Sequence, residues 1–161
     1  MKNIFIISII LFAIYSANAQ GIDIKDGVGI GSVKVGISTK KDIESKFGKP
    51  EQLIKHKKYS TQMLYKEKGL SFYFCQSDKK QQIFVIEIKR PFQGKTLRGV
   101  QIGTSTRKDV EKLYGNGNKK NKGREYRGIQ FYYTPTKKDG DIVTGIDIYE
   151  KTGIRQCKVS K

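Results

Sequence analysis

The residues of this chain best suited to chemistry are its lysines and arginines, and that chemistry is the binding of anions. Lysine and arginine number 32 against 15 aspartates and glutamates, which gives a formal charge of +17. A field of this sign favours nucleic acid, lipopolysaccharide, acidic glycans or an acidic protein surface as partners. The alternative is a solvated basic surface that has no ligand. The cations that we predict to contact a partner are Lys55, Lys57, Lys58, Lys119, Lys120, Lys122 and Arg124.

Tyrosines lie among these cations, and two of them follow phenylalanines in segments rich in strand-forming residues. Tyr73 follows Phe72, and Tyr132 follows Phe131. Because successive side chains of a strand point to opposite faces, we predict that Tyr73 and Tyr132 share one sheet surface. A basic surface with aromatic rings can bind single-stranded nucleic acid, glycans or a protein. The alternative is that these tyrosines are half-buried packing residues of ordinary strands.

Catalytic and metal-binding chemistry finds little support in the sequence. The single histidine, His56, lies in the basic run Lys55-His-Lys-Lys58, where an exposed loop or edge position is expected. The chain contains no H-x-x-x-H or C-x-x-C spacing that would hold a metal. We therefore predict that the protein is not an enzyme and has neither a metal site nor a cofactor.

Two cysteines, Cys75 and Cys157, leave two states open. In an exported protein an even number of cysteines is compatible with a disulfide, which would tie a strand in mid-chain to the C-terminal tail. The alternative is two separate thiols, with Cys75 packed as a small apolar residue.

The first 19 residues predict export from the cytoplasm. Lys2 precedes an apolar run from Ile4 to Tyr15, and Ala17-Asn-Ala19 is a cleavage motif before Gln20. The apolar run is shorter than the roughly 20 residues that a membrane span needs. We predict a mature, periplasmic or secreted protein that begins near Gln20 and has no membrane span.

A sequence pattern that occurs twice predicts two helices, which help to position these side chains. The sequence G-x-S-T-K/R-K-D-I/V-E-x-x-F/Y-G fills residues 36–48 and 103–115. Each copy predicts a helix of about two turns that begins with a capping box and ends at glycine in a left-handed conformation. The capping pairs are Thr39 with Asp42 and Thr106 with Asp109, and the apolar stripes are Ile43 with Phe47 and Val110 with Tyr114.

Such short helices are not stable alone, so we predict that each is docked on a sheet. Strand-forming residues follow each helix, at 62–66, 69–76 and 81–89 and again at 124–133 and around 146–148. The predicted fold class is α+β, with two tandem repeats, each a short capped helix packed on an antiparallel sheet of about three strands. The two sheets either run together or face each other. The predicted divisions are a signal peptide (1–19), a flexible lead-in (20–32), repeat 1 (33–90), a linker (91–99), repeat 2 (100–150) and a C-terminal tail (151–161).

The motif resembles the small repeat of the β-lactamase-inhibitor-protein fold and of the BamE-type outer-membrane lipoproteins. The residues that carry the resemblance are the helix pattern G-x-S/T-x-x-D-I/V-x-x-x-F/Y-G and the strand pattern Y-x-x-x-G-L-x-F-x-F, which begins at Tyr65. It covers about residues 33–90 and 100–150. Members of that fold bind proteins, which implies an adhesive or inhibitory role by analogy. No inhibitory loop can be matched residue by residue, and no lipidation cysteine is present.

Two binding functions follow from these observations. The first is a non-catalytic module that binds a protein of the cell envelope or the extracellular space. The second is a binder of anionic polymers, whose affinity would fall steeply with salt.

Overall fold

The computed structural model describes residues 22–57, 59–120, 123–136, 140–154 and 157. The predicted signal peptide and its cleavage site lie outside these residues, as do Lys58 and Lys122. Two helices of eight residues each, α1 (Lys40–Phe47) and α2 (Arg107–Tyr114), accompany eleven strands. The strands are β1 (Ile24–Lys25), β2 (Gly29–Ile30), β3 (Val33–Lys34), β4 (Gln52–His56), β5 (Ser60–Tyr65), β6 (Leu70–Cys75), β7 (Ile83–Lys89), β8 (Asn118–Lys120), β9 (Gly123–Tyr126), β10 (Ile129–Thr136) and β11 (Gly140–Tyr149), and a 3-10 turn spans Lys66–Lys68.

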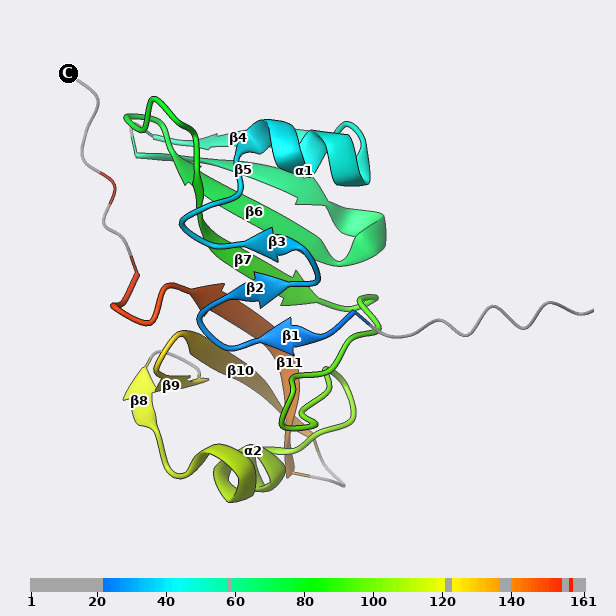
Figure 1. Cartoon of the computed structure of the whole chain (residues 1–161). Helices are drawn as coiled ribbons and strands as arrows, with labels where there is room; N and C mark the ends of the chain where they lie inside the picture. The colour runs from blue at the N-terminus through cyan, green and yellow to red at the C-terminus, as the bar shows by residue number, and fades with distance from the viewer. Residues whose placement is uncertain (1–21, 58, 121–122, 137–139, 155–156, 158–161) are drawn as a thin grey trace, which may run out of the picture.

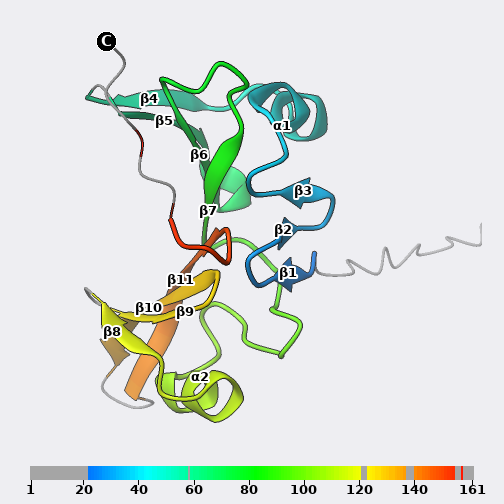
Figure 2. The same cartoon turned by 60° about the vertical axis from the view of Figure 1, so that its left-hand side comes forward.

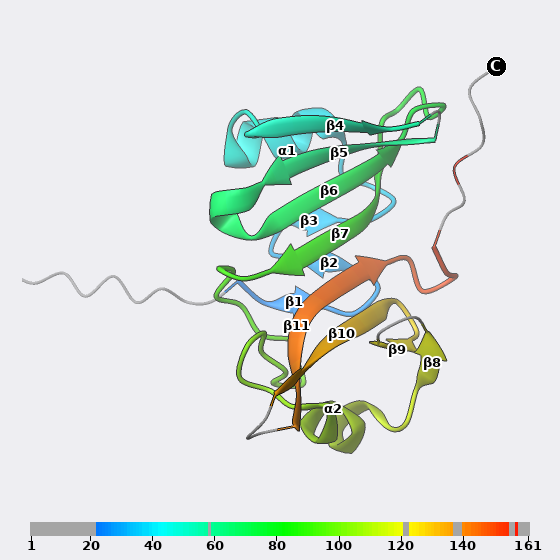
Figure 3. The same cartoon turned by 180° about the vertical axis from the view of Figure 1, so that it is seen from behind.

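The strands form two antiparallel sheets that lie face to face. The large sheet has eight strands in the order β4-β5-β6-β7-β11-β10-β9-β8, and the small sheet has the order β1-β2-β3. Both helices and the small sheet cover the same side of the large sheet, with the small sheet between the helices (Figures 1 and 2). The opposite side, which we call the uncovered face, carries no helix (Figure 3). The chain therefore makes a layered structure with one covered and one uncovered sheet face.

Residues 33–89, the N-terminal half, and residues 100–149, the C-terminal half, each contribute one helix and four strands of the large sheet to this arrangement. Each helix begins with the predicted capping box. Thr39 N–H donates to Asp42 Oδ2 at 2.7 Å and Asp42 N–H donates to Thr39 Oγ1 at 3.4 Å, while Thr106 and Asp109 make the same two bonds at 2.7 Å and 3.2 Å. The bonds from the threonine N–H hold the pKa of each aspartate below its ordinary value. Both predicted caps are confirmed.

The helices end at Gly48 and Gly115, but not in the left-handed helical conformation that the sequence predicts. Their φ angles are 82° and 81°, while their ψ angles are −168° and −169°. This extended region at positive φ is open almost only to glycine. The backbone therefore leaves each helix in an extended direction, toward the edge strand that follows.

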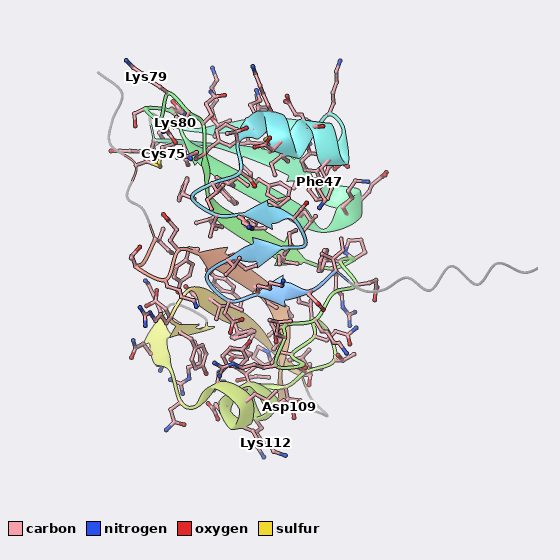
Figure 4. All side chains as sticks on the ribbon, in the orientation of Figure 1. Phe47, Cys75, Lys79, Lys80, Asp109 and Lys112 are labelled. Carbon is pink, nitrogen blue, oxygen red and sulfur yellow. A yellow bond between two sulfur atoms is a disulfide. The ribbon has the colours of Figure 1, made fainter. Side chains whose placement is uncertain are left out.

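The core lies between the large sheet and the layer of helices and small sheet. Phe72 and Phe131, at the centres of β6 and β10, are fully buried. Phe47 points from α1 toward the sheet, where its ring centroid lies 5.4 Å from that of Phe72, whereas Lys112 of α2 points to solvent (Figure 4). The apolar stripes of both helices are thus docked on the sheet, as their shortness requires.

The predicted fold class, two helix-capped repeats with about three strands each, is wrong. The chain is mostly strand, with one continuous eight-stranded sheet and a separate three-stranded sheet. The large sheet is continuous because β7 pairs with β11, from Val85 opposite Tyr149 to Lys89 opposite Gly145. This pairing satisfies backbone groups that would otherwise lie at the edges of two smaller sheets.

Two segments that the sequence predicts to be irregular are strands. Residues 24–34, placed mostly in the flexible lead-in, form the small sheet, and Ile24 and Ile30 are buried in the core. Residues 118–120 and 123–126, of which only 124–126 lie in a predicted strand, form β8 and β9, which pair with each other. In the part of the chain that the structure describes, no helix is long and apolar enough to cross a membrane.

Candidate anion-binding pocket

A pocket of about 460 Å³ opens in the C-terminal half, on the side of the large sheet that α2 covers. This volume is within the range of roughly 300–1,000 Å³ that is usual for small-molecule sites. The pocket combines the beginning of α2 with residues of four strands, β8 to β11. Its lining residues are Arg107, Lys119, Gly123, Arg124, Tyr133, Pro135 and Asp141.

Strand register brings the side chains of the pocket together. Lys119 lies opposite Arg124, and Arg124 lies opposite Phe131, whose ring is in the core beneath α2. Tyr133 is two residues beyond Phe131 and therefore points to the same side of the sheet. The cations of β8 and β9 and the side chain of Tyr133 thus line one side of the pocket.

The beginning of α2 supplies the other side. Thr106, the residue that caps α2, forms a bridge with Ile142 of β11, which places Arg107 beside Asp141. Arg107 Nη2 lies 2.5 Å from Asp141 Oδ2, and the guanidinium carbon of Arg107 lies 5.1 Å from the centre of the Tyr133 ring. Arg107 is therefore held at the pocket by an ion pair and by a cation–π contact.

Cations outnumber acids in this pocket. Arg124 Nη2 lies 3.6 Å from Glu111 Oε1, which is a long contact for an ion pair. Among the residues that the structure describes, no carboxylate lies within 4.0 Å of Lys119 Nζ. Three cationic side chains therefore line the pocket together with a single acid, Asp141.

Two buried polar atoms of the pocket residues have no hydrogen-bond partner, and both can donate. They are Nε of Arg107 and the hydroxyl of Tyr133. Burial raises the pKa of Tyr133 above its ordinary value, so the hydroxyl keeps its proton at neutral pH. A buried donor without an acceptor costs about 1–3 kcal/mol. An acceptor that entered the pocket would remove this cost, and an anionic acceptor would also be attracted by the cations.

The structure brings together two of the seven cations that the sequence predicts as contacts, Lys119 and Arg124. Lys120 points to the uncovered face, where its Nζ lies 2.6 Å from Glu125 Oε1. Lys55 and Lys57 are exposed at the end of β4 or just after it, at the opposite edge of the large sheet. The basic segments around residues 55 and 119 therefore do not form one surface.

The predicted placement of Tyr73 and Tyr132 on one sheet surface is confirmed. Both point to the uncovered face, because Phe72 and Phe131 point to the helices. The hydroxyl of Tyr73 donates to Glu87 Oε2 at 3.2 Å, and that of Tyr132 donates to Asp147 Oδ2 at 2.7 Å. These tyrosines are engaged with carboxylates and do not take part in the cationic pocket.

Glu87 and Asp147 lie directly opposite each other on β7 and β11. Burial, together with the charge of Glu87, raises the pKa of Asp147 to about 6. The side-chain amide nitrogen of Gln130, which lies opposite Asp147 on β10, is buried without a partner, as is Asp147 Oδ1. The centre of the uncovered face is thus a hydrogen-bonded polar cluster that carries acid rather than a cationic site.

Cys75 and Cys157 form a disulfide, so the first of the two states that the sequence allows is present. Their Cα atoms are 5.2 Å apart. Cys157 packs against an apolar group on the uncovered face that includes Phe84, Val85 and Tyr149. The bond joins Cys157 covalently to β6 of the N-terminal half.

Sequence reasoning missed three pocket residues, Arg107, Tyr133 and Asp141. Arg107 could have been found from its position in the first turn of a helix, where the helix dipole makes a cation unfavourable. A cation at such a position is a candidate for a role other than helix stabilisation. Strand phase was the signal for Tyr133, which continues the alternation of Ile129 and Phe131 and therefore has to place its hydroxyl on the covered side. Asp141 had no such signal, since its position follows only from the bridge between Thr106 and β11.

Comparisons with known proteins name no family for this chain. No protein-family model matches it, and no curated protein matches it. A solved structure, that of a DUF4309 family protein (YjgB) from Bacillus subtilis subsp. subtilis str. 168, is similar with a TM-score of 0.45 and 15% sequence identity. That alignment covers 77% of this chain and 88% of the other. At this level of similarity, nothing is carried over from that protein.

Proposed function

We propose that this protein is an exported, non-catalytic binding module that holds an anionic group of its partner in the pocket of the C-terminal half. The observation that supports this proposal best is the pair of buried donors, Arg107 Nε and the Tyr133 hydroxyl, which have no acceptor. Both belong to side chains that line a pocket with an excess of cations. A site that offers charge and unpaired donors together is suited to an anion.

The cations and unpaired donors of the pocket favour a partner that carries an anionic group. An acidic polymer or an acidic group on another molecule can satisfy the donors and the charge at once. The excess of 32 basic over 15 acidic side chains in the whole chain adds a long-range attraction for the same class of partner. If the predicted signal peptide directs export, such a partner lies outside the cytoplasm. The resemblance to the β-lactamase-inhibitor-protein fold stays a prediction and is not needed for this proposal.

The test compares two triple variants that remove the same charge. One carries Arg107→Gln, Lys119→Gln and Arg124→Gln in the pocket. The other carries Lys40→Gln, Lys55→Gln and Lys57→Gln in the N-terminal half. Binding to heparin, as a soluble acidic polymer, is measured by calorimetry at several salt concentrations, and circular dichroism checks that each variant is folded.

We expect the pocket variant to lose at least about 100-fold in affinity, because it removes up to three charged hydrogen bonds and each contributes about 1.5–3 kcal/mol, which is roughly 10- to 150-fold. The control variant should lose much less, since it changes only the general field of the protein. Equal losses in the two variants would show that heparin binds to net charge alone, and the pocket would then not be the site.

A further inference from the structure

The same pocket holds a carboxylate, and this restricts which anions can enter it. Asp141 lines the pocket, and its Oδ2 forms an ion pair with Arg107 Nη2. A simple anion that approaches Arg107 also approaches the negative charge of Asp141, which is unfavourable. A ligand that donates a hydrogen bond to Asp141 while it presents its own anionic group to the cations avoids this conflict.

The polar groups of the pocket therefore require two features in one ligand. The Tyr133 hydroxyl, Arg107 Nε, Lys119 and Arg124 are donors, and they require an anionic acceptor. Asp141 is an acceptor, and it requires a hydroxyl or another neutral donor. Sulfate and the carboxylate of a glutamate side chain provide the first feature only.

The size of the pocket agrees with a ligand larger than a simple anion. Its volume of about 460 Å³ is that of a site for a small organic molecule. Pro135 adds an apolar ring to a lining that is otherwise mostly polar. A sugar ring presents several hydroxyls around an apolar face and is therefore compatible with this lining.

We infer that the pocket recognises an acidic sugar residue, a saccharide unit that carries a carboxylate, sulfate or phosphate group next to its hydroxyls. The acidic group lies among Arg107, Arg124 and Lys119, where the Tyr133 hydroxyl donates to it. A ring hydroxyl donates to Asp141. This inference rests on the proposed function, since it names the class of ligand that the anion pocket takes.

The experiment measures binding of small probes to the disulfide-bonded mature chain by calorimetry or by NMR titration. D-glucuronate and glucose 6-phosphate carry both features, inorganic sulfate and N-acetylglutamate amide carry only the anion as a strong group, and D-glucose carries only the hydroxyls. We expect glucuronate or glucose 6-phosphate to bind at least about tenfold more tightly than either simple anion, because one additional hydrogen bond to a charged group has about this effect. Glucose should not bind measurably.

Variants of the two groups should act in different directions. Tyr133→Phe removes one donor to the anion and should weaken glucuronate and sulfate alike, by about tenfold. Asp141→Asn should weaken glucuronate relative to sulfate and should strengthen sulfate, because the repulsion is gone. Lys40→Gln, at the first position of α1, is the matched control and should change neither.

The outcomes separate this inference from the proposed function. If sulfate binds as tightly as glucuronate and glucose 6-phosphate, or if Asp141→Asn strengthens all anions equally, the site recognises anions without recognising hydroxyls. Tightest binding by N-acetylglutamate amide would indicate an acidic peptide as the ligand instead. In these cases the sugar inference fails while anion binding stands. If no anion binds, and heparin binding ignores the pocket variants, both proposals fail.

Discussion

The two halves of the molecule share the contacts that hold their helices on the large sheet. They differ in the side chains of the strands at the two ends of that sheet. In the N-terminal half the hydroxyl of Tyr65 donates to the carbonyl of Gly48 at 2.7 Å, and in the C-terminal half Tyr126 donates to Gly115 at 2.9 Å. Thr39 bridges to Gln82, as Thr106 bridges to Ile142. The capping, docking and closing contacts of each helix are therefore the same in kind.

The residues around the pocket are where the halves diverge. Strand register and helix position match each pocket residue with a counterpart in the N-terminal half: Arg107 with Lys40, Lys119 with Leu53, Arg124 with Met63, Tyr133 with Phe74 and Asp141 with Gln81. Met63 and Phe74 are buried and belong to the apolar core. Where one half fills the space with apolar side chains, the other lines a pocket with charged ones. Binding chemistry is therefore sought where the halves differ, and stability where they agree.

The largest effect on stability is expected from exchanging the side chains of one matched pair, Met63 and Arg124. Met63 is fully buried beneath α1, so Met63→Arg would bury a charge without a partner and should destabilise the fold by about 4 kcal/mol or more. Arg124→Met should change stability by no more than about 1 kcal/mol, because the contact of Arg124 with Glu111 is long and partly exposed. Denaturant unfolding of both variants measures the difference.

Arg124→Met should nevertheless weaken binding of the acidic probe, since it removes a cation from the pocket. The comparison of the halves would be undermined if Met63→Arg were tolerated as well as Arg124→Met. That outcome would mean that the space beneath α1 can also open to solvent.

The sequence predicts local features of both halves well. The Thr-x-x-Asp spacing gives both helix beginnings, because a capping box depends on residues three positions apart. The alternation of Phe72 with Tyr73 and of Phe131 with Tyr132 gives the correct faces, because strand phase is a property of neighbouring residues. These features need no knowledge of the remainder of the chain.

Features that depend on distant segments could not be predicted in this way. The small sheet consists of two-residue strands around Ile24, Ile30 and Val33, which are too short to show any periodicity. The pairing of β7 with β11 joins segments on either side of α2, and no local sequence pattern predicts this pairing. The pocket likewise draws Arg107, Tyr133 and Asp141 from a helix and two strands, so its composition appears only when the sheet is assembled.

A second difference between the halves concerns the two carboxyl groups at the centre of the uncovered face. Glu87 has Lys89 Nζ at 2.6 Å, while the Oδ1 atom of Asp147 is buried without a partner. The pKa of Asp147 is raised from 3.8 to about 6, first by burial. The folded protein therefore binds this proton more tightly than the unfolded chain does. The stabilisation is full below about pH 4 and is lost as the pH rises through about 6.

Asp147→Asn should remove this dependence. Between pH 4 and pH 7, the free energy of unfolding of the natural protein should fall by about 3 kcal/mol relative to that of the variant, which corresponds to about two pKa units. Urea unfolding at a series of pH values measures it. Parallel pH profiles of the two proteins would contradict a raised pKa at this position. Glu87→Gln removes a neighbouring charge that contributes to the raised pKa of Asp147, so it should reduce the pH dependence without abolishing it.

The smallest effects are expected at the residues that the halves share. Thr39→Ala and Thr106→Ala each remove the side-chain acceptor of a helix cap, and each should lower the free energy of unfolding by about 1 kcal/mol. The two losses should agree, because the capping bonds have the same partners and similar lengths in both helices. Neither variant should change the affinity for glucuronate or heparin, since the pocket side chains remain in place. A loss of binding in Thr106→Ala alone would show that the cap positions Arg107, the next residue along the chain. In that case α2 would contribute to binding as well as to stability.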